Sequence, residues 1–266
     1  MARGPGDRWA AGAAYEAYMG RWSRQLAREF LAWLRPPPAG HWLEVGCGTG
    51  SLTRGICTFC APSSLIACDP SAEFIEYSRN ALPDVRTSYV VASADGLPTR
   101  EGGFDVVVSG LVLNFVPEPE RALVAMRQRL RPGGTVGACV WDYAGGVEFL
   151  RYFWDEAVAL DPGAAALDEA RRFGHWRPDA LGTLFQDAGL ARVEGDVIEI
   201  PTGFADFDDY WTPFLGGTGP APSYVGSLDQ ERRDALRARL GERLPRAPDG
   251  RIELRARAYV ARGESS

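Results

Sequence analysis

The chain has 266 residues, of which 45% are hydrophobic and 24% are charged, close to the usage of folded globular domains. This length allows one sizeable core that carries an insertion. All 29 basic residues are arginines, which excludes enzymes that need a lysine as Schiff base, phosphate ligand or general base. The formal net charge of −6 disfavours a broad basic surface for nucleic acid or anionic membrane, so a neutral substrate is expected.

The five cysteines indicate reduced thiols in a cytosol, because their number is odd and they lie in apolar segments. Cys57 and Cys60 form a C-x-x-C pair inside an expected helix. A zinc or redox site there is the weaker alternative to helix-packing thiols, since the chain has no second such pair, and no metal is expected. Charged residues interrupt the apolar positions of residues 21–30, so no signal peptide or membrane span is expected and the predicted location is cytoplasmic.

The first half of the chain alternates strands and helices. Apolar residues at helical spacing predict a helix over residues 15–34, which ends before three prolines. A strand over residues 42–45 then leads into a glycine-rich turn and a helix over residues 51–60. A second strand at residues 65–68 is followed by a helix over residues 71–81. This order is typical of β-α-β units with a parallel sheet.

The second half continues the pattern. Strands are predicted near residues 89–92, 106–109 and, after the Pro132-Gly133-Gly134 turn, 136–141. Helices are predicted over residues 118–130, 147–160 and 178–188, and residues 192–200 and 252–260 are expected to pair as antiparallel strands. The predicted fold class is α/β: a Rossmann-like, seven-stranded, mostly parallel sheet with an antiparallel last strand, helices on both faces, an N-terminal helix and a lid insertion between the last two strands.

The predicted insertion is too long for a hairpin connection. It begins with aromatic residues, including Tyr210, Trp211, Phe214 and Tyr224, and continues with a helix over residues 228–244. We interpret it as a lid or substrate wall, with a packing appendage as the alternative. The predicted organisation is an N-terminal cap region (1–39), a core (40–200 and 251–263) and the lid (201–250).

A glycine-rich loop follows the first strand in Glu44-Val45-Gly46-Cys47-Gly48-Thr49-Gly50. Glycines at alternate positions let the backbone turn tightly and approach a ligand. The nicotinamide fingerprint G-x-G-x-x-G needs a glycine at position 51, where this chain has Ser51, so a dehydrogenase is disfavoured. Asp69 closes the second strand at a place where a carboxylate can accept both hydroxyls of a ribose.

These motifs resemble, in order, those of class I S-adenosylmethionine-dependent methyltransferases, of the small-molecule, methyltransferase type 11-like kind. The further matching segments are Ser93-Ala94-Asp95-Gly96-Leu97-Pro98, Phe104-Asp105-Val106-Val107-Val108-Ser109 and Leu130-Arg131-Pro132-Gly133-Gly134. The resemblance covers roughly residues 40–142.

The resemblance implies S-adenosylmethionine as cofactor and S-adenosylhomocysteine as product. It places Glu44 near the methionine amino group, Asp69 at the ribose and Ala94 at the adenine. Where relatives often have aspartate, this chain has Ser93, so Ser93 or a shifted Asp95 is expected at the adenine amino group. The complete predicted cofactor-binding set is Tyr18, Arg21, Glu44, Gly46, Cys47, Gly48, Asp69, Pro70, Ser93, Ala94, Asp95, Ser109, Gly110 and Leu111.

The predicted function is methyl transfer to a small-molecule acceptor, with O- or C-methylation of a hydrophobic or aromatic metabolite favoured. The electrophile is already activated, so no conspicuous catalytic motif is required. If a general base is used, His175 is the first candidate and Tyr18 a weaker one. The alternatives are an S-adenosylmethionine-binding enzyme that catalyses a rearrangement or cyclisation, and a non-catalytic regulatory module. The expected partner is the small-molecule substrate, with no nucleic acid or membrane, in a monomer or homodimer.

Overall fold

A computed structural model describes residues 12–265, which form two compact units. The sheet unit consists of residues 23–140, 176–198 and 258–265. The helical unit consists of residues 12–22, 141–175 and 199–257. Residues 1–11 of the predicted N-terminal cap lie outside the described part of the chain. Among the described residues, none of the helices has the length and apolar character needed to cross a bilayer.

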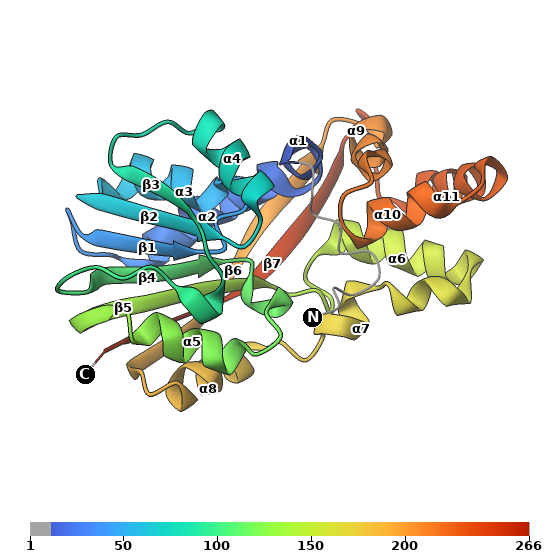
Figure 1. The fold of residues 1–266 in the computed structure, drawn as a ribbon. Coiled ribbons are helices and arrows are strands. Elements are labelled where there is room, and N and C mark those ends of the chain that lie inside the picture. The colour runs from blue at the N-terminus through green and yellow to red at the C-terminus, as the bar shows by residue number, and fades with distance from the viewer. Residues whose placement is uncertain (1–11, 266) are drawn as a thin grey trace. The chain divides into compact units, whose positions relative to one another are not determined.

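The sheet has seven strands in the order β3-β2-β1-β4-β5-β7-β6, which confirms the predicted Rossmann-like fold (Figure 1). The pairs β1–β2, β1–β4, β2–β3 and β4–β5 are parallel. Ion pairs between Arg192 and Glu264 and between Arg262 and Glu194 show that the last two strands run antiparallel. The strands are β1 (His41–Val45), β2 (Ser64–Asp69), β3 (Thr87–Val91), β4 (Phe104–Gly110), β5 (Leu130–Trp141), β6 (Ala191–Phe204) and β7 (Ile252–Glu264).

Helices cover both faces of the sheet unit (Figure 1). On one face α2 packs on α3, where a Cβ built on Gly55 would approach the Leu31 side chain to 2.9 Å. On the other face α5 and α8 lie against each other. The elements are α2 (Arg21–Leu34), α3 (Ser51–Gly55), α4 (Ala72–Ala81), α5 (Pro119–Arg127) and α8 (Pro178–Asp187), with the π-helical segment η2 (Ile56–Cys60) and the short 3-10 helices η3 (Ala94–Gly96) and η4 (Leu113–Phe115). Burial of the central strands' apolar side chains between these layers drives the fold.

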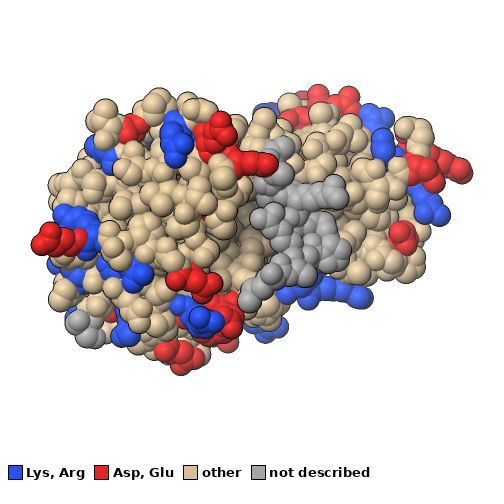
Figure 2. Space-filling model, viewed as in Figure 1, with Lys and Arg blue, Asp and Glu red and all other residues tan. Residues whose placement is uncertain are grey.

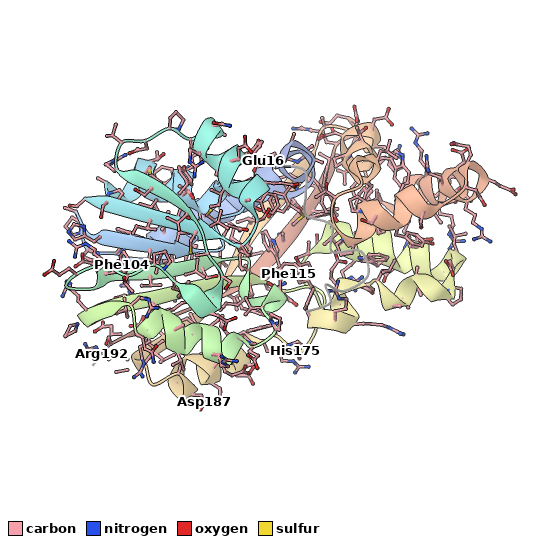
Figure 3. All side chains as sticks on the ribbon, viewed as in Figure 1. Glu16, Phe104, Phe115, His175, Asp187 and Arg192 are labelled. Carbon is pink, nitrogen blue, oxygen red and sulfur yellow. The ribbon has the colours of Figure 1, made fainter. Side chains whose placement is uncertain are left out.

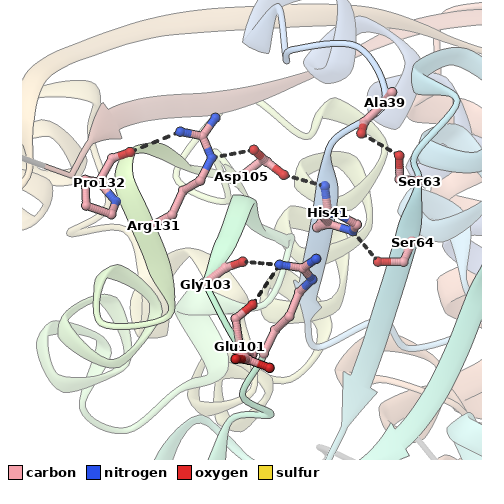
Figure 4. Close-up of polar contacts among 10 residues, drawn as sticks. Ala39, His41, Ser63, Ser64, Glu101, Gly103, Asp105, Arg131 and Pro132 are labelled. Atoms are coloured by element: carbon pink, nitrogen blue, oxygen red, sulfur yellow. Dashed lines mark hydrogen bonds and ion pairs between the residues drawn. The ribbon is translucent and has the colours of Figure 1, made fainter.

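Polar contacts hold the amino ends of the central strands in register (Figure 4). Asp105 on β4 accepts the backbone N–H of His41 at 2.7 Å and the Arg131 guanidinium at 2.5 Å. The His41 ring hydrogen-bonds Ser64 Oγ at 2.8 Å. Burial alone raises the pKa of Asp105, but these bonds lower it below its usual value. β1, β2, β4 and β5 are thereby aligned, and parallel strands aligned at one end present their carboxyl ends together at the other.

One predicted element is corrected. The Pro132-Gly133-Gly134 segment was expected to be a turn before a strand, but it lies within β5. The pairing with β4 steps from Leu130 opposite Phe104 to Thr135 opposite Val106, so the extra residues form a bulge. Gly133 has φ +73°, a backbone conformation that glycine adopts without strain.

The helical unit packs around aromatic rings. Its elements are α1 (Gly12–Tyr15), η1 (Glu16–Gly20), α6 (Glu148–Leu160), η5 (Pro162–Ala166), α7 (Glu169–Phe173), α9 (Phe207–Trp211), η6 (Thr212–Gly216), α10 (Pro220–Ser227) and α11 (Gln230–Arg243). Phe214 stacks on Phe153 of α6 with ring centroids 4.6 Å apart. Tyr210, Trp211 and Tyr224 are also buried. The aromatic residues of the predicted lid therefore form much of this unit's core.

Charged side chains of both signs are interspersed on the face drawn in Figure 2. Among the residues coloured there, no continuous basic area is seen. Many arginines pair with neighbouring acids, as Arg255 does with Glu199 and Arg257 with Asp142.

Candidate functional site

The glycine-rich loop links the end of β1 to the start of α3 in the sheet unit. The backbone N–H groups of Gly46 and Cys47 both donate to the Cys68 carbonyl, at 2.8 and 2.9 Å. Gly46 has φ +78°, and a Cβ there would lie 2.6 Å from the Val112 side chain. Glycine is thus required at this position both for its backbone angle and for its size.

Gly48 forms the half-buried turn of this loop. Its N–H donates to Asp69 Oδ2 at 3.0 Å, and its carbonyl accepts the Ser78 hydroxyl at 2.7 Å. A Cβ on Gly48 would meet nothing within 4 Å, so one side of this peptide is open. A ligand can therefore approach the backbone here, beside a loop that two side chains hold in place.

Asp69 ends β2, next to β1 in the sheet. Its side chain is buried, and Oδ1 accepts the Ser71 N–H at 2.8 Å. Each carboxylate oxygen has two lone pairs, so a vicinal diol can bond to both oxygens alongside the two backbone donors. This geometry suits the predicted ribose contact.

Glu44 lies on β1, only 1% exposed. Its Oε2 accepts the Thr53 hydroxyl at 2.5 Å. Burial is the main cause that raises the pKa of Glu44 to about 7; the Asp69 charge raises it further, and the Thr53 bond lowers it. A cation brought to this carboxyl would favour its ionised form, as expected for a group that meets an ammonium.

The end of β4 carries polar atoms that the protein itself leaves without partners. Ser109 is fully buried and its hydroxyl has no hydrogen bond. Gly110 and Leu111 follow, with Leu111 at φ +62°, a strained angle for a branched side chain, fixed by its N–H bond to the Cys139 carbonyl at 2.8 Å. Asn114 in η4 is 7% exposed, and both atoms of its amide are unpartnered.

Asn114 was not among the predicted site residues. Burying an amide without hydrogen bonds is unfavourable by about 1–3 kcal/mol, so such a group points to a ligand. The sequence offered one sign of it, because a lone asparagine stands within the otherwise apolar run Leu111 to Val116.

The end of β3 supplies a more exposed edge. Ser93 and Asp95 are exposed, and Ala94 is half-buried. Asp95 lies 3.8 Å from Arg121. Pro70 is exposed directly after Asp69, whereas the Cys47 side chain packs into the core against Ala67 and Ile75. Burial also raises the pKa of the Cys47 thiol.

Three predicted residues belong to the helical unit. Arg21 bonds Asp209 at 3.0 Å, with its guanidinium over the rings of Trp22 and Phe204. Tyr18 is buried, and its hydroxyl has no partner. His175 is exposed and follows α7 by two residues (Figure 3). The roles predicted for these three residues stay predictions.

The candidate site residues of the sheet unit lie at the carboxyl ends of neighbouring strands. β1 pairs with β2 on one side and β4 on the other, so the ends that carry Glu44, Asp69 and Ser109 are neighbours. The strand order reverses at β1 and β4, and open α/β sheets bind ligands at such a point. Two buried carboxyls and an open backbone peptide therefore lie at the edge of the sheet where a ligand is expected.

Comparison with known proteins agrees with this site. Residues 43–138 match the family described as "Methyltransferase domain". An uncharacterized methyltransferase of Mycobacterium tuberculosis is 33% identical over 119 residues, 43% of this chain and 44% of that protein. A thiol S-methyltransferase of Homo sapiens is 30% identical over 154 residues, 56% of this chain and 60% of that protein. The chain thus spans about half the length of these curated relatives.

A solved structure shares the fold. Phosphoethanolamine N-methyltransferase 2 of Haemonchus contortus, in complex with S-adenosyl-L-methionine, has a TM-score of 0.58 and 15% identity. The match covers 96% of this chain and 58% of that one. Over residues 43–138 the chain is thus similar to class I S-adenosylmethionine-dependent methyltransferases, and its seven-stranded sheet and glycine-rich loop agree with this match.

Proposed function

We propose that this protein transfers the methyl group of S-adenosylmethionine to a small-molecule acceptor, by O- or C-methylation of a hydrophobic or aromatic metabolite. The observation that carries the proposal is the open backbone of Gly48, flanked by the acids Glu44 and Asp69 at the carboxyl ends of β1 and β2. Two buried acids beside an accessible peptide form a site for a ligand that carries both a cation and a diol.

Different residues of the sheet unit would bind different parts of the cofactor. Glu44 would bind the ammonium group, and Asp69 would accept the ribose hydroxyls while it holds the Gly48 N–H. Ser109 and the Gly110 and Leu111 backbone would contact the middle of the ligand. Ala94, with Ser93 or Asp95, would border the adenine. A family match over residues 43–138, which includes all of these positions, supports this division.

When bound, the sulfonium supplies an activated methyl group for an in-line displacement. The chain's own task is to align the acceptor and exclude water, which contributes several kcal/mol without a proton-transfer residue. An N-methyltransferase acting on nucleobases or glutamine is disfavoured, because Ser109-Gly110-Leu111-Val112 stands where those enzymes have an Asn-Pro-Pro-Tyr type motif. The preference for an aromatic acceptor rests on the aromatic composition of the insertion, with Tyr210, Trp211, Phe214 and Tyr224.

Calorimetric titration of the purified protein with S-adenosylmethionine, S-adenosylhomocysteine and NAD tests the cofactor. We expect micromolar binding of the first two and none of NAD. Incubation with a panel of phenols and other small acceptors, followed by mass spectrometry, then tests the reaction. A product heavier by one methylene supports methyl transfer, whereas a rearranged product of unchanged mass would show a non-methylating enzyme. A folded protein that binds no S-adenosylmethionine would refute the proposal.

A further inference from the structure

A buried asparagine follows β4 at the carboxyl edge of the sheet. Asn114 lies in η4 and is 7% exposed, and neither atom of its amide has a hydrogen-bond partner within the described part of the chain. An amide offers both a donor and an acceptor, and leaving both buried and unpaired is unfavourable. The group that pairs with Asn114 should therefore carry a donor and an acceptor close together.

Backbone contacts place Asn114 on the Glu44 side of the glycine-rich loop. The strand that carries Glu44, β1, pairs directly with β4. Beyond the ends of these strands, a Cβ on Gly46 would lie 2.6 Å from the Val112 side chain, so the segment before Asn114 packs on the start of the loop. The Phe115 N–H donates to the Val112 carbonyl at 2.8 Å, which closes a tight turn around Asn114. The Cα atoms of such a turn lie within about 7 Å of one another.

The strand order separates Asn114 from the residues proposed for the rest of the cofactor. In the order β3-β2-β1-β4, β4 lies beside β1 and away from β2 and β3. Neighbouring strands are about 4.8 Å apart, so the end of β4 is about 5 Å from that of β1, about 10 Å from that of β2 and about 14 Å from that of β3. Asp69 ends β2, and Ala94 follows β3. Asn114 is therefore closer to the proposed ammonium contact than to the proposed ribose and adenine contacts.

We propose that Asn114 binds the amino-acid end of S-adenosylmethionine and so determines which adenosyl sulfur compounds the site accepts. The inference rests on the proposed function and names the part of the cofactor that this residue recognises. The amino-acid end carries an ammonium donor and a carboxylate acceptor on one carbon atom, which matches the two atoms of the amide. Asn114 Oδ1 would share the ammonium with Glu44, and Asn114 Nδ2 would donate to the carboxylate.

A contact between Asn114 and adenine fits less well. Asparagine can pair with adenine through both amide atoms. An adenine at Asn114 would, however, lie next to Glu44, which is 1% exposed. A buried carboxylate needs a cation or several hydrogen bonds when it is ionised, and adenine supplies no cation. The amino-acid end satisfies Asn114 and Glu44 together.

Calorimetric titration of the whole protein with two probes tests which part of the cofactor Asn114 contacts. S-adenosylhomocysteine has the complete amino-acid end, whereas methylthioadenosine lacks it and keeps adenine, ribose and sulfur. In Asn114→Leu we expect S-adenosylhomocysteine affinity to fall about tenfold and methylthioadenosine affinity to stay unchanged. Asp69→Ala should weaken both probes, because both carry the ribose. An equal loss of both probes in Asn114→Leu would indicate an adenine or ribose contact and overturn the proposal.

A charge change tests the carboxylate contact with little change of size. The probe is the decarboxylated analogue of S-adenosylhomocysteine, which keeps the ammonium. In Asn114→Asp at about pH 8, the new carboxylate would repel the carboxylate of S-adenosylhomocysteine and attract the ammonium of both compounds. The ratio of S-adenosylhomocysteine affinity to analogue affinity should therefore fall at least about tenfold.

The matched control for this charge change is Asn80→Asp, the same substitution at an exposed position of α4. It should leave the affinity ratio as it is in the unmodified protein. An unchanged ratio in Asn114→Asp would refute the carboxylate contact.

Titration of the unmodified protein separates this inference from the proposed function. A folded protein that binds none of these compounds would contradict the proposed function itself. Normal binding of S-adenosylhomocysteine and methylthioadenosine, with Asn114→Leu changing neither affinity, would leave the cofactor site standing and overturn only the assignment of Asn114.

Discussion

Replacing Glu44 by glutamine should make the free protein more stable while it weakens the cofactor site. Glutamine keeps an oxygen that can accept the Thr53 hydroxyl. It removes a carboxyl whose pKa rises from 4.5 to about 7 on burial. A difference of about 2.5 pKa units corresponds to about 3 kcal/mol of unfavourable free energy in the folded, ionised state.

The sign of this effect fixes its pH range. A raised pKa in the folded state means that the folded form holds its proton more tightly than the unfolded chain. Stability from this group is therefore present below pH 4.5 and is lost as the pH rises to about 7. The gain from Glu44→Gln should accordingly be absent in acid and reach about 3 kcal/mol above neutral pH.

Denaturant unfolding at several pH values measures the gain, and calorimetry measures S-adenosylmethionine binding. In the unmodified protein the affinity should rise about eightfold between about pH 6 and about pH 7.5, as Glu44 ionises. The Glu44→Gln variant should bind weakly with a flat profile over this range. Glu169→Gln is the matched control, because its pKa is also raised to about 7: it should gain stability and keep cofactor affinity. A Glu44→Gln protein that binds normally would refute the reasoning.

Three further results are expected. Asp69→Ala should reduce S-adenosylmethionine affinity by about 1–3 kcal/mol in calorimetry, whereas Asp95→Ala, at a side chain 79% exposed, should cost less than that. Gly46→Ala should lower the unfolding free energy by about 2–4 kcal/mol, because the new Cβ would lie 2.6 Å from the Val112 side chain. Gly48→Ala should lower the unfolding free energy by only about 1 kcal/mol, because its Cβ meets nothing, but it should block ligand binding. Asn114→Leu should leave the Tm of the free protein unchanged or higher and weaken S-adenosylhomocysteine binding about tenfold; a lower Tm with normal binding would contradict a ligand contact.

The sequence predicted the sheet because its signals are local. Strands such as Trp42 to Val45 are short apolar runs followed by turn residues, and β-α-β rhythm constrains their order. Glu44 and Asp69 were predicted because they stand beside strand ends, where position along the chain nearly determines position in space. The bulge at Gly133 was missed because proline and glycine also mark turns, and only pairing with β4 distinguishes the two.

The aromatic insertion shows the limit of such reasoning. Tyr210 and Phe214 were expected to line a lid, yet both are fully or almost fully buried in the core of the helical unit. Amino-acid composition does not distinguish an aromatic residue that lines a ligand site from one that packs on Phe153, since both have apolar neighbours. The division into cap, core and lid therefore stays a prediction, although α9, α10 and α11 do lie between β6 and β7.

Glu44 and Glu169 are buried carboxyls whose ionisation is unfavourable in the free protein. Both are almost fully buried, each accepts one side-chain hydrogen bond, and both have a pKa raised to about 7. Only Glu44 stands in a motif, so only Glu44 could be predicted. A protein with an apolar residue at either position would have a higher free energy of unfolding above neutral pH. Because its ionised carboxyl destabilises the free protein, Glu44 is better explained by the ammonium contact proposed for it than by the fold alone.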